Sequence, residues 1–186
     1  MAAAALDPDL EARLRSVVRT VPDWPHAGIM FRDVTPLFST ADTFRLLTAE
    51  LCAEADRRNA VSVAGVDARG FIVGAAMAHE LGIGFVPIRK AGKLPADVIA
   101  ESYDLEYGSA TVEIHVDSIG LGDRVVLVDD LIATGGTMLA AHRLLTRLGA
   151  VIVSAMAIVD LPELGGSAAL EAAGLDVYSL LTYEGD

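Results

Sequence analysis

Two adjacent acids and the glycine-rich turn after them are the residues of this sequence best suited to bind a ligand. Asp129 and Asp130 end the apolar run 125–128, where carboxylates can bind sugar hydroxyls directly or through water and a metal. Paired glycines let backbone amides approach an anion, and a helix that begins there adds its positive end. Two threonines add hydroxyl donors. We expect a seat for a ribose 5-phosphate formed by Ala133, Thr134, Gly135, Gly136 and Thr137.

Two other interpretations of this segment are weaker. A bare Thr-Gly-Gly-Thr turn can serve only to bend the chain, but the acid pair before it favours a binding role. An apolar run ending in two acids is also typical of the metal-binding strand of an ATPase. That class of enzyme needs a Gly-x-x-x-x-Gly-Lys-Ser/Thr loop, which the sequence lacks. A Gly-x-Gly-x-x-Gly turn is absent as well, so a dinucleotide-binding fold has little support.

Basic residues gather at one place in an otherwise acidic chain. The net charge is -12, and the only lysines are Lys90 and Lys93, which lie beside Arg89. The charge argues against a broad nucleic-acid-binding face, because binding a phosphate backbone needs many Lys and Arg side chains together. The cluster can be an ordinary surface loop, but its isolation favours a local site for a polyanion.

Length and composition fit one cytoplasmic domain. The 186 residues are enough for one continuous core and too few for two large domains. Cys52 is the only cysteine, which excludes an internal disulfide framework and favours a reducing compartment. We expect no membrane association, because the longest uncharged apolar stretch, residues 148–159, is too short to span a bilayer as a helix. Residues 1–5 lack the basic lead-in of a secretory signal.

Short β-branched runs alternate with helical segments along the chain, and glycines stand where the helices should end. The expected strands are 61–66, 83–88, 125–128 and 151–158, and the expected helices are 41–58, 70–81, 136–148 and one near 163–173. This order predicts an α/β fold with a parallel sheet covered on both faces, which gathers ligands at the carboxyl ends of its strands. Two segments break the order. We expect a mobile loop at 91–108 before an antiparallel strand at 111–116, and an irregular segment at 21–36 folded over the domain.

Five segments, in order and at similar spacing, resemble the adenine-specific members of the type I phosphoribosyltransferase family. They are residues 22–33, 67–71, 89–95, 102–108 and 125–137, and the resemblance covers about 21–183. It implies the type I phosphoribosyltransferase fold in one domain over 1–186, with a small N-terminal hood of about 1–36 and a flexible catalytic loop of about 91–108. It also implies a homodimer that joins adenine to the donor PRPP, giving AMP and pyrophosphate in purine salvage.

The resemblance also assigns roles to residues. Asp129 and Asp130 would face the ribose, and the turn that follows would bind the 5-phosphate. The donor would bring Mg²⁺, bridged by its own oxygens rather than held mainly by the protein. Arg and Lys side chains suit the leaving group, because they clamp phosphoryl oxygens. The residues implied at the pyrophosphate are Asp67, Ala68, Arg69, Arg89, Lys90, Lys93 and Tyr107, of which Arg69 and Lys90 would be catalytic.

The base and its proton involve a further set of residues. The resemblance gives Glu106 the role of general acid and base near the purine N7, brought in by closure of the loop. Adenine would stack on Phe31 and contact Arg32 and Leu161. Related enzymes that act on 6-oxopurines usually carry an aspartate at the position of Ala133, which favours adenine.

Three alternatives to this function stay open. The first is a phosphoribosyltransferase for xanthine, guanine or orotate. The second is a non-catalytic PRPP-binding regulator of transcription, which would need a basic DNA-binding module that the charge and length do not provide. The third is a catalytically inactive interaction subunit, against which the acid pair and Glu106 both count.

Overall fold

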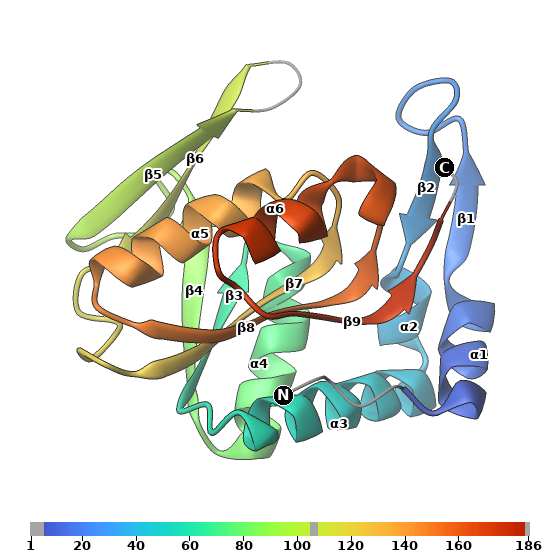
Figure 1. Cartoon of the computed structure of the whole chain (residues 1–186), viewed down its shortest axis with the longest axis horizontal. Helices are drawn as coiled ribbons and strands as arrows, with labels where there is room; N and C mark the ends of the chain where they lie inside the picture. The colour runs from blue at the N-terminus through green and yellow to red at the C-terminus, as the bar shows by residue number, and fades with distance from the viewer. Residues whose placement is uncertain (1–5, 105–107, 185–186) are drawn as a thin grey trace.

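The main element of the fold is a seven-stranded sheet with the strand order β5-β6-β4-β3-β7-β8-β9 (Figure 1). The computed structural model describes residues 6–104 and 108–184. Five neighbouring strands are parallel, and the last two strands at one end of the sheet, β6 and β5, pair antiparallel with their neighbours. The parallel strands are β3 (Ser62–Val66), β4 (Gly84–Lys90), β7 (Arg124–Ile132), β8 (Val151–Asp160) and β9 (Val177–Thr182).

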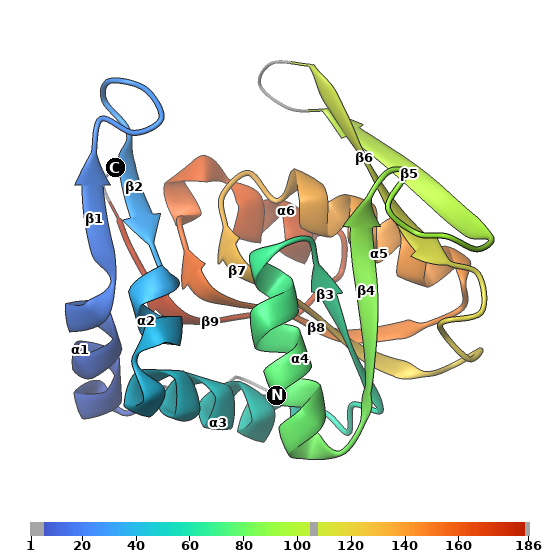
Figure 2. The same ribbon diagram turned by 180° about the vertical axis from the view of Figure 1, so that it is seen from behind.

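Helices cover both faces of this sheet. α3 (Ala41–Arg57) and α4 (Arg69–Leu81) lie on one face, and α5 (Gly136–Arg147) and α6 (Gly166–Ala172) lie on the other (Figures 1 and 2). Each face has its own cluster of buried apolar side chains, and residues of β7 contribute to both. Val125, Val126, Leu127 and Val128 are fully buried, as expected for a strand enclosed on both sides. The predicted α/β fold is confirmed.

Two antiparallel hairpins rise from opposite ends of the molecule. One is a separate two-stranded sheet of β1 (Arg19–Pro22) and β2 (Met30–Asp33), placed between α1 (Pro8–Val17) and α2 (Thr35–Ser39). The other is formed by β5 (Val98–Asp104) and β6 (Ser109–His115). Figure 2 shows the carboxyl ends of the central strands between these two hairpins. A ligand bound at that edge of the sheet therefore lies within reach of both.

The helices and central strands occur where the sequence predicts them, within a few residues. Gly82, which follows α4, has the positive φ of 66° that a helix-ending glycine adopts. The strand β7 continues through the acid pair to Ile132, because β8 pairs with it along that length. The helix expected near 163–173 is the short 3-10 helix η1 (Pro162–Leu164) followed by α6.

The segments expected to be irregular are more ordered than predicted. Residues 98–104, placed in the expected loop, form a full strand because β6 pairs with every one of them. Residues 21–36 contain most of a hairpin and the start of α2 rather than an irregular segment. Both segments depend on a partner strand for their hydrogen bonds, and local propensity does not report that partner. None of the described helices is long and apolar enough to cross a membrane.

Candidate active site

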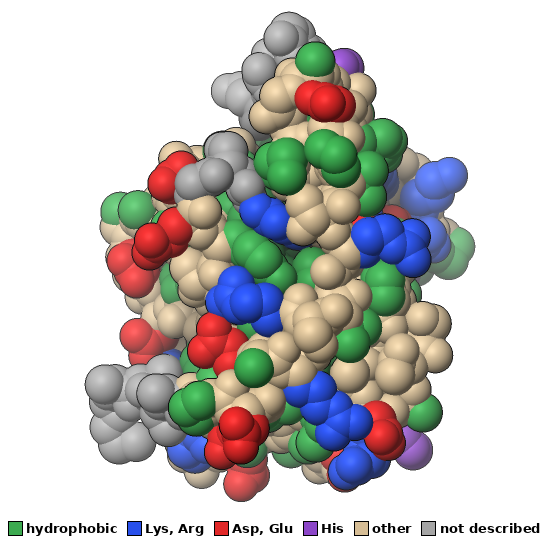
Figure 3. All heavy atoms as spheres, turned by 90° about the vertical axis from the view of Figure 1, so that its right-hand side faces the viewer, with side chains coloured by type: hydrophobic (Ala, Val, Ile, Leu, Met, Phe, Trp, Pro, Cys, Tyr) green, Lys and Arg blue, Asp and Glu red, His purple; other side chains and the backbone are tan. Residues whose placement is uncertain are grey.

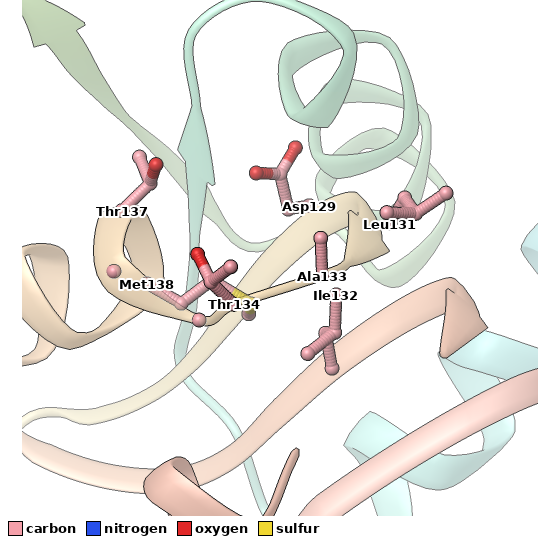
Figure 4. Close-up of a pocket in the computed structure, with 9 residues that line it drawn as sticks. Asp129, Leu131, Ile132, Ala133, Thr134, Thr137 and Met138 are labelled. Atoms are coloured by element: carbon pink, nitrogen blue, oxygen red, sulfur yellow. The ribbon is translucent and has the colours of Figure 1, made fainter. Parts of the chain in front are cut away.

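The turn between β7 and α5 forms a pocket at the carboxyl edge of the sheet. In Figure 4 the carboxylate of Asp129 and the hydroxyls of Thr134 and Thr137 lie on one side of this turn, and Ile132 points to the other. All five residues predicted for the phosphate seat line the pocket. The complete lining is Asp129, Leu131, Ile132, Ala133, Thr134, Gly135, Gly136, Thr137 and Met138.

The conformation of this turn requires glycine. Gly135 is the residue before α5 and has a φ of 77°, which side chains other than glycine rarely tolerate. Gly136, Thr137 and Met138 of the first helical turn line the pocket, and the amides at a helix start have no acceptor within the helix, which is the usual setting of an anion site. The arrangement is therefore chemically suited to a phosphate group.

The two acids differ in their surroundings. Asp130 is 4 % exposed, and its carboxylate accepts a hydrogen bond from Arg69 Nε at 2.5 Å. Asp129 is half-buried and accepts one from the Asp130 amide at 2.8 Å. Burial raises the pKa of Asp129 well above its usual range, and the neighbouring charge of Asp130 acts in the same direction. The pair therefore provides one carboxylate tied to a cation and one whose proton affinity is high.

Apart from Tyr107, the residues predicted at the pyrophosphate lie at the carboxyl ends of β3 and β4 or in the segments that directly follow them. Asp67 and Ala68 follow β3 and are joined by a cis peptide bond. The carboxylate of Asp67 pairs with Arg89 Nε at 3.3 Å, and Arg89 Nη1 donates to the carbonyl of Lys93 at 3.2 Å. Lys90 ends β4 and is exposed, as is Lys93. The side chains of Arg69 and Arg89 are thus both fixed by acids of the same edge.

A second pocket lies between the N-terminal hairpin and the start of α4, and it contains Phe31 and Arg69 together. The ring of Trp24 meets Phe31 edge to face, with centroids 4.3 Å apart. The pocket therefore combines aromatic and charged side chains in its lining. Its lining is Val21, Trp24, Phe31, Asp33, Val34, Thr35 and Arg69.

The other two residues predicted at the base lie outside that lining. The guanidinium of Arg32 donates to Thr20 Oγ1 at 2.6 Å and lies over the Tyr183 ring, 4.4 Å from its centroid. Leu161 packs against the buried cluster on the α3 face, and its amide donates to the carbonyl of Ile132 at 3.0 Å. Of the residues predicted at the base, Phe31 therefore shares a pocket with Arg69, whereas Leu161 lies beside the end of β7.

Sequence reasoning missed Asp33 and Trp24 in the second pocket. Asp33 accepts hydrogen bonds from the amide and hydroxyl of Thr35 at 2.9 and 2.7 Å. Burial acts to raise the pKa of Asp33, but these bonds and the charges of Arg19 and Arg69 leave it below its usual value. The carboxylate beside Arg69 is therefore ionised at neutral pH. The only sequence feature that could have pointed to Asp33 was its position at the end of the segment 22–33, which resembles the family.

Two predicted residues, Glu106 and Tyr107, lie outside the described part of the chain. The described arms of their hairpin are tied to α5. Arg143 Nε lies 2.6 Å from Glu101 Oε1, and Arg147 Nη1 donates to the carbonyl of Ala100 at 2.9 Å. The hairpin that carries the predicted general acid and base is thus attached to the helix that begins at the phosphate seat.

Away from this edge, a further pocket lies between α3 and α4 and is lined by Ala41, Phe44, Arg45, Thr48, Ala49, Ala76, His79 and Glu80. Within residues 6–104 and 108–184, no group of three or more His, Cys, Asp or Glu side chains is placed to hold a metal ion. On the end of the molecule that carries α1, β1 and β2, acidic and basic side chains are interspersed (Figure 3). Among the described residues, the acid pair and the basic side chains predicted for the site lie at the carboxyl edge of the sheet.

Comparison with known families agrees with this geometry. The phosphoribosyl transferase domain family matches residues 41–167, which include six of the seven strands of the main sheet, β3 to β8. The fold and the β7–α5 turn therefore define a phosphoribosyltransferase of type I.

Full-length relatives narrow the class. An adenine phosphoribosyltransferase of Methylibium petroleiphilum is 56% identical over 177 residues, covering 95% of this chain and 90% of the relative. The structure of the enzyme of that name from Thermoanaerobacter pseudethanolicus superposes with a TM-score of 0.88 at 40% identity, covering 93% and 99% of the two chains. That from Saccharomyces cerevisiae, complexed with an imino-altritol bisphosphate and adenine, gives 0.89 at 34% identity, covering 94% and 100%. The chain belongs to the adenine phosphoribosyltransferase family.

Proposed function

We propose that this protein transfers the 5-phosphoribosyl group of PRPP to adenine, releasing pyrophosphate and forming AMP for purine salvage. The observation that carries the proposal is the position of Arg69, which pairs with Asp130 beside the phosphate seat and also lines the aromatic pocket of Phe31. A base in the second pocket and a sugar phosphate in the first therefore meet at one side chain. The family to which the chain belongs supports the same reaction.

The reaction exchanges one bond at the anomeric carbon for another. The bond to the pyrophosphate oxygen breaks, the bond to the purine nitrogen forms, and the base loses one proton. The amides and hydroxyls from Ala133 to Thr137 hold the 5-phosphate, and this fixes the sugar relative to both partners. Asp129 and Asp130 bind the ribose hydroxyls and stabilise the positive charge that develops on the sugar.

Positive groups at the ends of β3 and β4 stabilise the leaving group. Arg69, Arg89, Lys90 and Lys93 surround the place where pyrophosphate leaves, and the turn at Asp67 and Ala68 contributes its backbone. Charged donors of this kind are worth the most where they meet developing negative charge. Tyr107 contacts the same group when the hairpin closes.

The acid pair also suits the Mg²⁺ that this family uses with its donor. Two adjacent carboxylates are hard oxygen groups, and no third acid joins them among the described residues, so the donor's own oxygens would supply most of the ligands of the ion. Asp129 and Asp130 would hold the ion through the ribose hydroxyls and through water. When bound, the ion neutralises charge on the pyrophosphate.

The base is held by the N-terminal hairpin and loses its proton to the second hairpin. Adenine stacks on Phe31, the backbone at Arg32 binds its amine edge, and Leu161 supplies an apolar contact. Glu106 exchanges the proton at the purine N7, since Ala133 has no group that can do so. Closure of the 91–108 segment excludes water from the reactive sugar.

We propose further that the protein acts as a homodimer in the cytoplasm, as the family resemblance implies. The partner subunit would supply part of the pyrophosphate site. Sedimentation of the purified protein tests the dimer. Mixing two inactive variants tests the sharing of the site: one variant is changed in the pyrophosphate residues and the other in the remaining site residues. Activity returns on mixing only if each site is formed by residues of both subunits.

The proposed reaction is tested by incubating the purified protein with PRPP, Mg²⁺ and one base at a time. We expect AMP from adenine and no nucleotide from hypoxanthine, guanine, xanthine or orotate. If only a 6-oxopurine gave a nucleotide, the protein would be a phosphoribosyltransferase for that base and not for adenine. PRPP binding without any product would favour a regulator.

A further inference from the structure

We propose that Gly166, at the start of α6, is a positioning residue for the 5-phosphate of the donor. It fixes the direction in which the phosphate-binding turn presents its amides, and it can do so only because it has no side chain. The inference rests on the proposed function and extends it to a residue outside the β7–α5 segment. Sequence reasoning gave Gly166 no role.

The backbones of Gly166 and the turn are in direct contact. The amide of Gly166 donates a hydrogen bond to the carbonyl of Ala133 at 3.0 Å. A Cβ on Gly166 would lie 2.2 Å from that carbonyl oxygen and 2.7 Å from the amide nitrogen of Gly135. Both neighbours are backbone atoms, so they cannot rotate away as the end of a flexible side chain would.

The contact is tight from both sides. A Cβ on Gly135 would lie 2.9 Å from the carbonyl oxygen of Gly166 and 3.0 Å from its Cα. The two glycines therefore form a backbone-to-backbone contact that no larger residue fits at either position. Gly135 also needs its positive φ, but Gly166 lies within α6, so close packing is the feature that requires glycine there.

This contact sets the direction of the phosphate-binding amides. The peptide between Ala133 and Thr134 is trans, because the cis bonds of the described chain lie elsewhere. In a trans peptide the carbonyl and the following N–H point in opposite directions. Since the Ala133 carbonyl is held toward Gly166, the amide of Thr134 is directed away from α6. Thr134 lines the pocket of the proposed phosphate seat. The hydrogen bond from Gly166 therefore leaves the Thr134 amide available as a donor to the anion and keeps the Ala133 carbonyl away from it.

The start of α6 is itself held in place from behind. Asp160, which ends β8 and is 7 % exposed, lies beside the side chain of Ser167 in the first turn of α6. Leu170 of α6 is fully buried in the cluster on that face. The backbone at Gly166 is therefore held in position. When a side chain is added there, we expect the turn to move rather than α6.

The test compares Gly166→Ala with Gly174→Ala, which changes a glycine just after the other end of the same helix. Gly174 has a φ of 86° and open space around its Cβ position, so its replacement strains the backbone without touching the turn. Ribose 5-phosphate and pyrophosphate serve as separate binding probes, measured by calorimetry, together with the KM for PRPP and for adenine and the melting temperature.

We expect Gly166→Ala to weaken ribose 5-phosphate binding and to raise the KM for PRPP, each by about tenfold or more, because a misdirected amide loses a charge-assisted hydrogen bond. Pyrophosphate binding should change less than about twofold, since its site lies at the ends of β3 and β4. Gly174→Ala should lower the melting temperature and leave both ligands unaffected. Unchanged ribose 5-phosphate binding in Gly166→Ala, or an equal loss for both probes, would overturn the proposal.

A second variant covers the case in which Gly166→Ala does not fold. Ser167→Ala removes the hydroxyl beside Asp160 without adding volume, so the start of α6 is held less firmly against the turn. A smaller loss, selective for ribose 5-phosphate, supports the proposal, and an unselective loss or none contradicts it. If the wild-type protein binds ribose 5-phosphate but makes no AMP from adenine, the proposed reaction fails while the role of Gly166 is still measured.

Discussion

Arg69 and Asp130 are 61 residues apart in the sequence, yet Arg69 Nε lies 2.5 Å from Asp130 Oδ2. The carboxylate is almost fully buried, and the guanidinium is about half exposed and reaches into the pocket of Phe31. An anion that approaches Arg69 must therefore compete with Asp130 for the positive charge of the guanidinium. The pair couples the proposed ribose site to the proposed pyrophosphate site.

Replacing Asp130 with asparagine should separate the role of Asp130 at the ribose from its effect on the charge of Arg69. We expect turnover to fall roughly 100-fold, because a carboxylate facing the charged sugar is lost. Pyrophosphate alone should bind several-fold more tightly, because Arg69 no longer shares its charge with an acid. Steady-state kinetics and calorimetry measure the two. Asp176→Asn is the matched control, since Asp176 pairs with Arg58 Nη1 at 2.5 Å away from the site. Near-normal turnover in Asp130→Asn with lower thermal stability would mean that Asp130 is only structural.

The role of Phe31 can be tested with a substitution that keeps an apolar side chain of moderate size. Phe31→Leu should raise the KM for adenine by about fivefold to tenfold, since an aromatic contact is worth about 1 kcal/mol beyond its buried area. The KM for PRPP should stay the same. Phe38→Leu breaks the edge-to-face pair of Phe38 and Phe44, which packs against the core, and serves as the control for packing loss. A rise in both KM values would argue against a base-stacking role.

Glu106→Gln tests the proposed general acid and base. The amide keeps the size of the side chain but cannot exchange a proton, so kcat should fall by roughly 100-fold or more. The binding of PRPP, measured without adenine, should change little. Glu163→Gln is a control at another acid of the chain. A pH profile of kcat that loses one limb in Glu106→Gln supports the role, and unchanged turnover rejects it.

The ion pairs between the second hairpin and α5 should matter for catalysis more than for stability. Glu101 pairs with Arg143 at 2.6 Å and with Arg147 at 3.4 Å, and both arginines are about half exposed. Such pairs contribute about 1 kcal/mol or less to folding. We therefore expect Glu101→Gln to lower kcat several-fold, through a less well-placed hairpin, with a small change in melting temperature. Glu11→Gln, which removes the i,i+4 pair with Arg15, should change neither.

Cys52 should make stability depend on pH in alkaline solution. Burial raises the pKa of this thiol to about 11, with the charge of Glu80 acting in the same direction. The unfolded thiol ionises near pH 8.5, so the unfolded state gains from deprotonation before the folded state does. Stability should therefore fall as the pH rises from about 8.5 to about 11, by up to about 3 kcal/mol. Urea unfolding at several pH values checks this. Cys52→Ala should reduce the slope, and an unchanged slope would contradict the prediction.

The sequence predicts best what depends on local pattern. The buried strands, the glycines that end the helices and the acid pair before the turn all have signals that can be recognised within a few residues. The strand at 98–104 and the hairpin at 19–33 do not, because their hydrogen bonds come from a partner strand. The contact of Gly166 with Ala133 is harder still, since it joins backbones 33 residues apart and leaves no side chain as a clue.

The N-terminal hairpin forms a sheet of its own, separate from the seven strands that carry the phosphate seat. Under the proposed assignments, the aromatic contact to the base comes from this hairpin and the phosphate seat from the main sheet, and the two meet at Arg69. On this proposal, we expect that changes to the hairpin alter which nucleobase is accepted while the cradle for the sugar phosphate keeps its shape. This modularity makes the first 36 residues the natural region in which to redesign base preference.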